Sequence, residues 1–555
     1  MMLSLLKKSW SLLLSFIEKA ENESIGFGAW FITFIFIVFI RNFLEAFSSG
    51  FNFLSPQSWS FFFLHSVASY LFIFGAFILI SHFLTGQRIE KVSKASLWLA
   101  PWILAAPVFD LVFSRGKDIA VRYSELPFSG LSDILIGCYN FIFFAPNGLL
   151  RFANQFWGWG NAEAFNSLFS HSFGVRIEVG LVILGAMFYV FLKTKNIWRS
   201  ILFLLIARAI MFVAEFFPYL ITAWLGLPNE SSSFHNVSKI NPDFSWNFIL
   251  FSLYFLFIVI FAAIWFWRYD KNKLLALAKN VRPERLALYL GAFYYGIYLA
   301  GPNGFNFFDI LLIIIASLAI FFSWLFAVGS NDLADEGGDR ISKAYRPLPS
   351  GQLSHSEVKS LNLIFRVASY ICALMAGYAF FITILIRSAI SYIYSNYPFR
   401  LKKYPFISTF CIASGVTLGV LGGFLLFSDK TIFDFPARTI LFLLVFFTLG
   451  MNFIHIKDRE GDKKEEVWTL PVIFGEVGGK LACGFCLAAA FLAVPFFYPD
   501  IPGFSIPIFL LMPLVGFWLI NKKSFKEWQA IVLCGVFAAL VILFTEQPLW
   551  HLIWK

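Results

Sequence analysis

The chain has 555 residues, of which 59% are hydrophobic, 20% are aromatic and only 14% are charged. This composition excludes a soluble globular protein and a disordered one, and it is typical of a protein that crosses a membrane many times. The formal net charge of +10 does not indicate nucleic-acid binding, because the basic residues lie between apolar runs, where cytoplasmic loops collect them.

The first half of the chain, residues 1–275, contains six apolar runs that we predict to be transmembrane helices. They cover residues 27–47, 61–84, 97–113, 175–192, 201–225 and 248–267. Residues 131–150 are also apolar, but an Ala-Pro-Asn-Gly sequence interrupts them, which suits a re-entrant or surface segment. Leaving them out of the count of spans keeps the basic loops and the N-terminus on the cytoplasmic side. Since no catalytic motif occurs here, we expect this half to dock a protein partner, deliver a lipid substrate or stabilise the fold.

The second half, residues 276–555, follows a basic linker at 268–285 and is predicted to contain nine further spans. They cover residues 286–300, 308–328, 358–375, 378–393, 406–427, 440–455, 481–497, 506–520 and 528–544. The predicted fold is therefore an all-α polytopic membrane protein, in which a nine-helix transmembrane bundle follows a separate bundle of about six helices.

The first motif of the second half follows the apolar run 310–328. It contains Asn331, Asp332, Asp335 and Asp339, four oxygen-bearing side chains within nine residues. If the helix continues through the motif, Asn331, Asp335 and Asp339 are spaced at i, i+4 and i+8 and stack on one face. Such a stripe of carboxylates suits hard cations such as Mg²⁺.

A second motif follows the apolar run 440–454 and places Asp458 and Asp462 at i and i+4. Both motifs fall on the cytoplasmic face, because the loops after the second, fourth, sixth and eighth spans of this half are rich in Lys and Arg. Carboxylates at the carboxyl end of a helix oppose its dipole, so two such stripes are unfavourable as ordinary solvated loops. Together the motifs predict a diphosphate-binding Mg²⁺ site at one end of the bundle.

These motifs resemble the signatures of the UbiA superfamily of intramembrane prenyltransferases. The resemblance runs from about Val281 to the C-terminus and is absent from the first half. It is carried, in order, by NDLADEGGD at 331–339, RPLPSG at 346–351, YSNYPFRLKKYP at 394–405, DREGD at 458–462 and TLPVIFG at 469–475.

The resemblance implies a helical bundle around a central cavity, in which an isoprenyl group is moved from a prenyl diphosphate to an aromatic, quinone-precursor or lipid acceptor with the help of Mg²⁺. By the same resemblance, the metal ligands are Asn331, Asp335, Asp458 and Asp462, and Asp335, Asp339, Asp458 and Asp462 are the catalytic carboxylates. The substrate-binding residues implied are Asp332, Arg346, Tyr394, Tyr397, Arg400 and Lys402.

Two other functions stay open at this stage. Some superfamily members transfer phosphoribose to a polyprenyl phosphate, and a transporter or scaffold could bind a cation at these motifs without chemistry. The acceptor is also open among aromatic acids, tetrapyrroles and glycerol-phosphate lipids. Charge places the N-terminus and the mouth of the site in the cytoplasm, and we expect a bacterial inner membrane. Arg387, inside a predicted span, is expected to extend toward the membrane surface.

Overall fold

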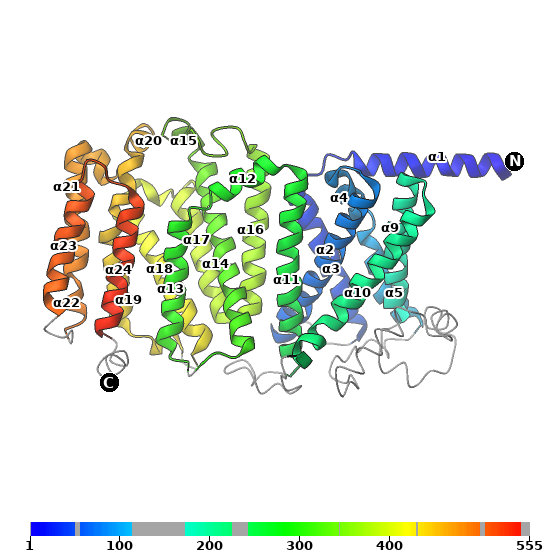
Figure 1. Cartoon of the computed structure of the whole chain (residues 1–555), viewed down its shortest axis with the longest axis horizontal. Coiled ribbons are helices and arrows are strands. Elements are labelled where there is room, and N and C mark those ends of the chain that lie inside the picture. Colours follow the sequence, from blue (N-terminus) through cyan, green and yellow to red (C-terminus); the bar gives the residue numbers. More distant parts are fainter. Residues whose placement is uncertain are drawn as a thin grey trace. The chain divides into compact units, whose positions relative to one another are not determined.

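The computed structural model of the chain describes residues 2–49, 56–113, 173–224, 242–302, 304–342, 344–428, 431–499 and 505–545. Throughout these ranges the regular structure is helical (Figure 1). Eleven helical stretches are long and apolar enough to cross a membrane, and two shorter apolar helices follow near the C-terminus. The prediction of an all-α polytopic membrane protein is confirmed. The chain divides into two compact units, residues 1–274 with 306–311, and residues 275–305 with 312–555.

The helices of the first unit follow the predicted spans closely. They are α1 (Met2–Glu21), α2 (Phe27–Ser49), α3 (Pro56–Thr85), α4 (Ile89–Leu97), η1 (Ala100–Leu104), α5 (Ala105–Phe113), α9 (Phe173–Thr194), α10 (Ile197–Trp224) and α11 (Pro242–Tyr269). The predicted span 97–113 is instead a broken helix, because Pro101 stands at the start of the 3₁₀ segment η1 and lacks the N–H that an uninterrupted α-helix requires. Residues 131–150 lie outside the described ranges.

The first unit buries a group of charged side chains between its helices. Arg41 of α2 is 5% exposed and forms ion pairs with Glu45, one turn further along, and with Glu178 of α9, at 3.4 Å. Tyr70 of α3 donates a hydrogen bond of 2.5 Å to Glu178, and its ring lies 5.5 Å from the Arg41 guanidinium. Three helices are therefore joined by charge as well as by apolar packing.

The second unit contains the nine long helices at the nine positions predicted for them. They are α13 (Pro283–Ala300), α14 (Phe307–Ala334), α16 (His355–Ala376), α17 (Tyr378–Ser395), α18 (Ile407–Phe427), α19 (Ala437–Gly450), α21 (Leu470–Leu492), α23 (Ile506–Asn521) and α24 (Glu527–Thr545). The start of α21 differs from the prediction, since the helix begins at Leu470 and not at residue 481. Thr469 is the N-cap residue and Pro471 lies in the first turn, and Gly475, at φ 74°, kinks the helix before the polar residues Glu476 and Lys480.

Glycines bring α13 and α18 into backbone contact. A β-carbon at Gly296 of α13 would overlap the carbonyl oxygen of Val420, and one at Gly423 of α18 would overlap the carbonyl oxygen of Phe293. Only glycine permits so close an approach of two helices. This seam holds α13 and α18 together as one wall of the site described below.

Candidate active site

The first motif continues the helix that precedes it. The Asp335 N–H donates to the Asn331 carbonyl oxygen at 2.9 Å, and the Asp339 N–H donates to that of Asp335 at 2.8 Å. The helical turn thus passes from the 28-residue α14 into the short helix α15 (Glu336–Ser342). As a result Asn331, Asp335 and Asp339 stack on one face, as their spacing predicted.

The second motif lies in a tighter helical segment. After α19 the chain forms the 3₁₀ helix η4 (Met451–Asp458) and then α20 (Arg459–Lys464). Asp458 is the N-cap residue of α20, and Asp462 lies one turn later. The Thr469 hydroxyl donates to an Asp462 carboxylate oxygen at 3.5 Å, and the ring of His455 lies 3.9 Å from the same carboxylate.

Both motifs line one open cavity, whose empty space, with the solvent at its mouth included, is about 1280 Å³. The walls come from α13, α14, α17, α18 and the η4–α20 segment. Of the predicted site residues, those on the lining are Asn331, Asp335, Asp339, Arg346, Tyr394, Lys402, Asp458 and Asp462. The rest of the lining is largely apolar and aromatic, including Leu288, Tyr289, Trp324, Ile412 and Met451. The cavity therefore has a charged mouth and an interior that is apolar apart from Arg387.

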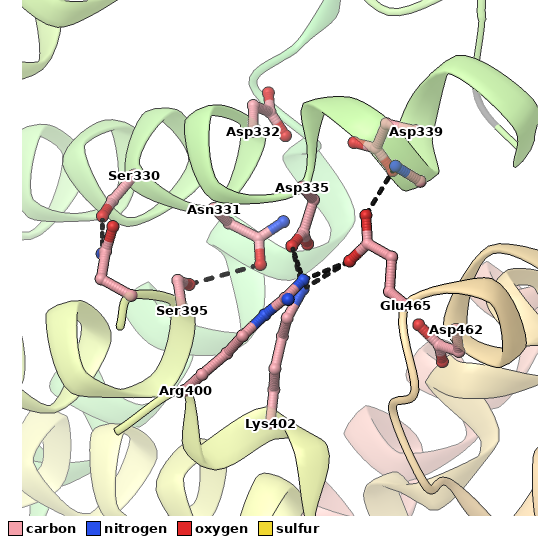
Figure 2. A network of polar contacts seen from close by, with 12 residues as sticks. Ser330, Asn331, Asp332, Asp335, Asp339, Ser395, Arg400, Lys402, Asp462 and Glu465 are labelled. Atoms are coloured by element: carbon pink, nitrogen blue, oxygen red, sulfur yellow. Dashed lines mark hydrogen bonds and ion pairs between the residues drawn. The ribbon is translucent and has the colours of Figure 1, made fainter. Parts of the chain in front are cut away.

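The carboxylates at the mouth are paired with cations from the loop between α17 and α18 (Figure 2). Lys402 forms an ion pair with Asp335, and Arg400 lies 3.3 Å from the same carboxylate. Arg400 also pairs with Glu465, which accepts a hydrogen bond of 2.5 Å from the Gly338 N–H. Glu465 thus connects the first motif, the second motif and the cationic loop.

Glu465 was missed by the sequence reasoning, although a signal for it was present. Asp458, Asp462 and Glu465 are spaced at i, i+4 and i+7, which is the spacing of a single helical face. The Lys-Lys-Glu-Glu run around it suggests an ordinary solvated loop. In the structure only Glu466 of that acidic pair is exposed, while Glu465 lines the cavity.

Asp332 and Asp339 are both engaged by Arg346. The Arg346 guanidinium forms an ion pair with Asp339 and lies 3.1 Å from Asp332. Asp332 also accepts hydrogen bonds from Asn280 at 2.6 Å and Arg282 at 2.7 Å, so three groups hold its buried carboxylate. It points away from Arg400 and Lys402 and does not line the cavity (Figure 2).

The two tyrosines predicted to bind substrate lie in different places. Tyr394 lines the cavity, whereas Tyr397 is 66% exposed and accepts a hydrogen bond of 2.9 Å from Arg400. That hydrogen bond and the charges of Arg400 and Lys403 lower the pKa of the Tyr397 hydroxyl. Burial lowers the pKa of Arg400, but Tyr397, Glu465 and Asp335 outweigh it and leave that pKa above its ordinary value.

Three arginines on the lining, Arg282, Arg285 and Arg387, were not predicted as site residues. Arg285 of α13 donates from Nε to Glu527 of α24 at 2.7 Å, and Glu527 also pairs with Lys457 of η4. Arg387 of α17 is 4% exposed and faces the cavity interior, so it does not extend to the membrane surface as expected. The sequence of so apolar a helix does not indicate which of its faces points toward the cavity, so the orientation of Arg387 could not be predicted.

Within the described ranges, no three His, Cys, Asp or Glu side chains lie close enough together to hold a metal ion by themselves. Mg²⁺ is commonly held by one or two carboxylates that share it with substrate phosphates and water. The oxygen donors of the two motifs, which face one cavity, fit an ion bound in that shared way.

The sequence resembles proteins of known activity over its second half. Residues 289–541 match the profile of the UbiA prenyltransferase family. Digeranylgeranylglyceryl phosphate synthase of Methanococcus vannielii is 28% identical over 245 residues, which are 42% of this chain and 84% of that protein. Chloroplastic chlorophyll synthase of Avena sativa is 33% identical over 162 residues, 28% of this chain and 42% of that protein. A UbiA homolog from Archaeoglobus fulgidus, solved with GPP and Mg²⁺, is 19% identical with a TM-score of 0.41, covering 49% of this chain and 99% of that one.

Proposed function

The C-terminal half of this chain belongs to the UbiA prenyltransferase family, and from that membership we propose that its cavity binds a prenyl diphosphate and transfers the isoprenyl group to a lipid-soluble acceptor. The observation that carries the proposal is the meeting of both carboxylate motifs and several cations at the mouth of one cavity whose interior is mainly apolar. A diphosphate suits the charged end, and an isoprenyl chain suits the apolar end.

Asn331, Asp335, Asp458 and Asp462 are the residues we expect to hold Mg²⁺. Their oxygen atoms belong to two segments that face each other across the mouth, so a shared ion would draw the two motifs together. When bound, Mg²⁺ would supply positive charge to the leaving diphosphate.

The cations at the mouth are placed to receive a diphosphate. Lys402 and Arg400 pair with Asp335 and Glu465, and Arg346 pairs with Asp339. A diphosphate entering this network would accept hydrogen bonds from the same Lys and Arg side chains, because their ion pairs already hold them at the mouth. Fixed donors aimed at developing negative charge favour the departure of the diphosphate.

The interior of the cavity would protect the allylic cation that departure leaves behind. Leu288, Ile412 and Met451 line this part and would exclude water from it, and the ring of Trp324 would offer π-electrons to the cation. Exclusion of water favours transfer to the acceptor over hydrolysis.

The relatives narrow the acceptor to be tested first. One relative is named for a synthase of a prenylated glyceryl phosphate and another for chlorophyll synthesis, so their acceptors differ in chemistry. We take a geranylgeranylglyceryl phosphate as the first acceptor because the relative with the larger coverage carries that name. From the basic loops around the mouth we propose that it opens to the cytoplasm, and that the membrane is a bacterial inner membrane.

The test uses the full chain in lipid nanodiscs with Mg²⁺, labelled geranylgeranyl diphosphate and geranylgeranylglyceryl phosphate. We expect diphosphate release together with a labelled ether lipid, and loss of both when EDTA replaces Mg²⁺. The proposal would be contradicted if the chain binds the prenyl diphosphate but releases no diphosphate with an aromatic acid, a tetrapyrrole or a glycerol-phosphate lipid, each supplied in turn as the acceptor.

A further inference from the structure

Arg387 occupies an unusual position in the second unit. It lies near the middle of the apolar helix α17, its side chain is 4% exposed, and it lines the cavity. Its guanidinium stacks 4.3 Å from the ring centre of Tyr289, and Nη1 lies 3.5 Å from the carbonyl oxygen of Ile320. The contact with Ile320 is at the limit of a hydrogen bond, and among the described residues no other hydrogen bond from the guanidinium is present.

The other cations on the cavity lining each have a carboxylate partner. These pairs are Arg282 with Asp332, Arg285 with Glu527, Arg346 with Asp339, and Lys402 with Asp335. Arg387 has no carboxylate within ion-pair distance among the described residues. Burying a charge without a counter-ion in a membrane-spanning helix is costly, and such a residue commonly marks a binding site.

Arg387 lies deeper in the cavity than the charged mouth, on the side toward which a bound isoprenyl chain would extend. Ser395, at the end of α17, donates to Asn331 at 3.4 Å, and Arg387 lies about 12 Å further in along that helix. A diphosphate at the mouth would therefore direct its isoprenyl chain toward Arg387. A lone positive charge there would oppose the allylic cation, because like charges repel strongly where water is excluded.

We infer that Arg387 binds the anionic group of the acceptor, either a phosphate or a carboxylate. This inference rests on the proposed prenyl transfer. The bound anion would satisfy the donors of Arg387 and cancel its charge inside the cavity in which the allylic cation forms, and the ring of Tyr289 would hold the guanidinium in place. A charged acceptor is then selected over a neutral one of the same shape.

A small inner cavity offers a different role for the same residue. It is lined by Tyr289, Ile320, Phe380, Thr383, Ile384, Arg387, Leu418 and Gly419. Because Tyr289 and Arg387 line both cavities, their pair stands between the main cavity and this inner space. If the pair served only as a floor that limits the isoprenyl chain, replacing Arg387 would change the length of isoprenyl chain that the cavity accepts. The preference for an anionic over a neutral acceptor would then stay unchanged.

The experiment measures equilibrium binding of matched acceptors to the full chain in nanodiscs, with Mg²⁺ and the unreactive geranylgeranyl thiolodiphosphate. The phosphate arm compares geranylgeranylglyceryl phosphate with geranylgeranylglycerol, and the carboxylate arm compares 4-hydroxybenzoate with its methyl ester. In at least one of the two arms, the wild type should bind the anionic acceptor about tenfold more tightly than its neutral counterpart. Arg387→Met should reduce that preference below about twofold, while Arg387→Lys should keep part of it.

Arg366→Met is the matched control. Arg366 also lies on a membrane helix, α16, with its guanidinium 5.6 Å from the ring of Phe326, but it does not line the cavity. Retained binding of the thiolodiphosphate shows that a variant is folded. If Arg387→Met does not fold, Arg387→Gln replaces it in the comparison.

The inference is overturned if the wild type shows no anion preference in either arm, or if Arg387→Gln and Arg387→Met keep it. A longer accepted isoprenyl chain with unchanged acceptor preference would assign Arg387 to the floor instead. Release of diphosphate from hydrolysable substrate is followed on the same preparations. Failure of the wild type there contradicts prenyl transfer itself, and is thereby distinguished from failure of the Arg387 assignment.

Discussion

The two compact units both bury charged side chains among apolar helices, but they surround those charges differently. In the first unit, Arg41, Glu45 and Glu178 pack against one another and against Tyr70. In the second unit, Asp335, Lys402 and their neighbours line a cavity. Charge inside a membrane helix therefore does not by itself identify a reaction site. Access to a cavity separates the charges that can meet a ligand from those that join helices.

The largest effect should follow from Asp335→Asn in the second unit. The change keeps the shape of the side chain but removes a carboxylate that faces the cavity and pairs with Lys402. Turnover should fall about a hundredfold to a thousandfold, measured as diphosphate release per folded protein. Asp434→Asn, which alters a capping carboxylate in the short helix η3 (Ile432–Asp434), should leave turnover nearly unchanged. Equal losses in both variants would break the comparison.

The next effect concerns the first unit and should be one of stability. Arg41→Met leaves the buried carboxylates of Glu45 and Glu178 without that cation, so the fold should lose about 3 kcal/mol. The measurement is the thermal unfolding of the full chain in detergent, with turnover per folded molecule unchanged. Lys94→Met, which removes the i,i+4 pair with the half-exposed Glu90, should cost less than about 1 kcal/mol. A turnover defect in well-folded Arg41→Met would assign the first unit a part in the chemistry.

A moderate effect is expected from Glu465→Gln. This variant keeps a group that can accept from the Gly338 N–H but loses the charge that holds Arg400. We expect turnover to fall about tenfold, because a residue that orients a binding group costs less than the group itself. The neighbouring exposed residue provides the control, and Glu466→Gln should behave as wild type. An unchanged Glu465→Gln variant would show that Arg400 needs no such anchor.

The smallest effect should come from Tyr397, on the exposed rim of the site. Its hydroxyl has a lowered pKa in the folded protein, so the unfolded chain holds that proton to higher pH. Between the lowered value and the ordinary pKa of about 10, the folded state therefore gains stability as the pH rises. The wild type should gain slightly in unfolding temperature relative to Tyr397→Phe between pH 8 and pH 10. A constant difference across that range would contradict the assignment.

Much of the fold could be predicted from the sequence because long apolar runs determine where membrane helices form. The stack of Asn331, Asp335 and Asp339 was also predictable, since helical spacing fixes which residues share a face. The early start of α21 was not, because polar residues after the Gly475 kink concealed the helix.

The partners of individual charges were harder to predict. The sequence of the first motif does not reveal that Asp332 turns toward Asn280 and Arg282 while Asp335 faces the cavity. Nor does it reveal that Arg387 points inward, because a helix with apolar residues on every face carries no sign of its orientation. Such pairings depend on tertiary packing between segments that are distant in the chain.

The glycine seam between α13 and α18 limits how a long isoprenoid can reach the cavity. At Gly296 and Gly423 the two backbones touch, so no side chains are present there that could rotate aside. Parting the helices would open an unfilled gap along their whole line of contact. This wall is therefore fixed, and an isoprenyl chain that enters the cavity from the surrounding lipid must pass between other helices.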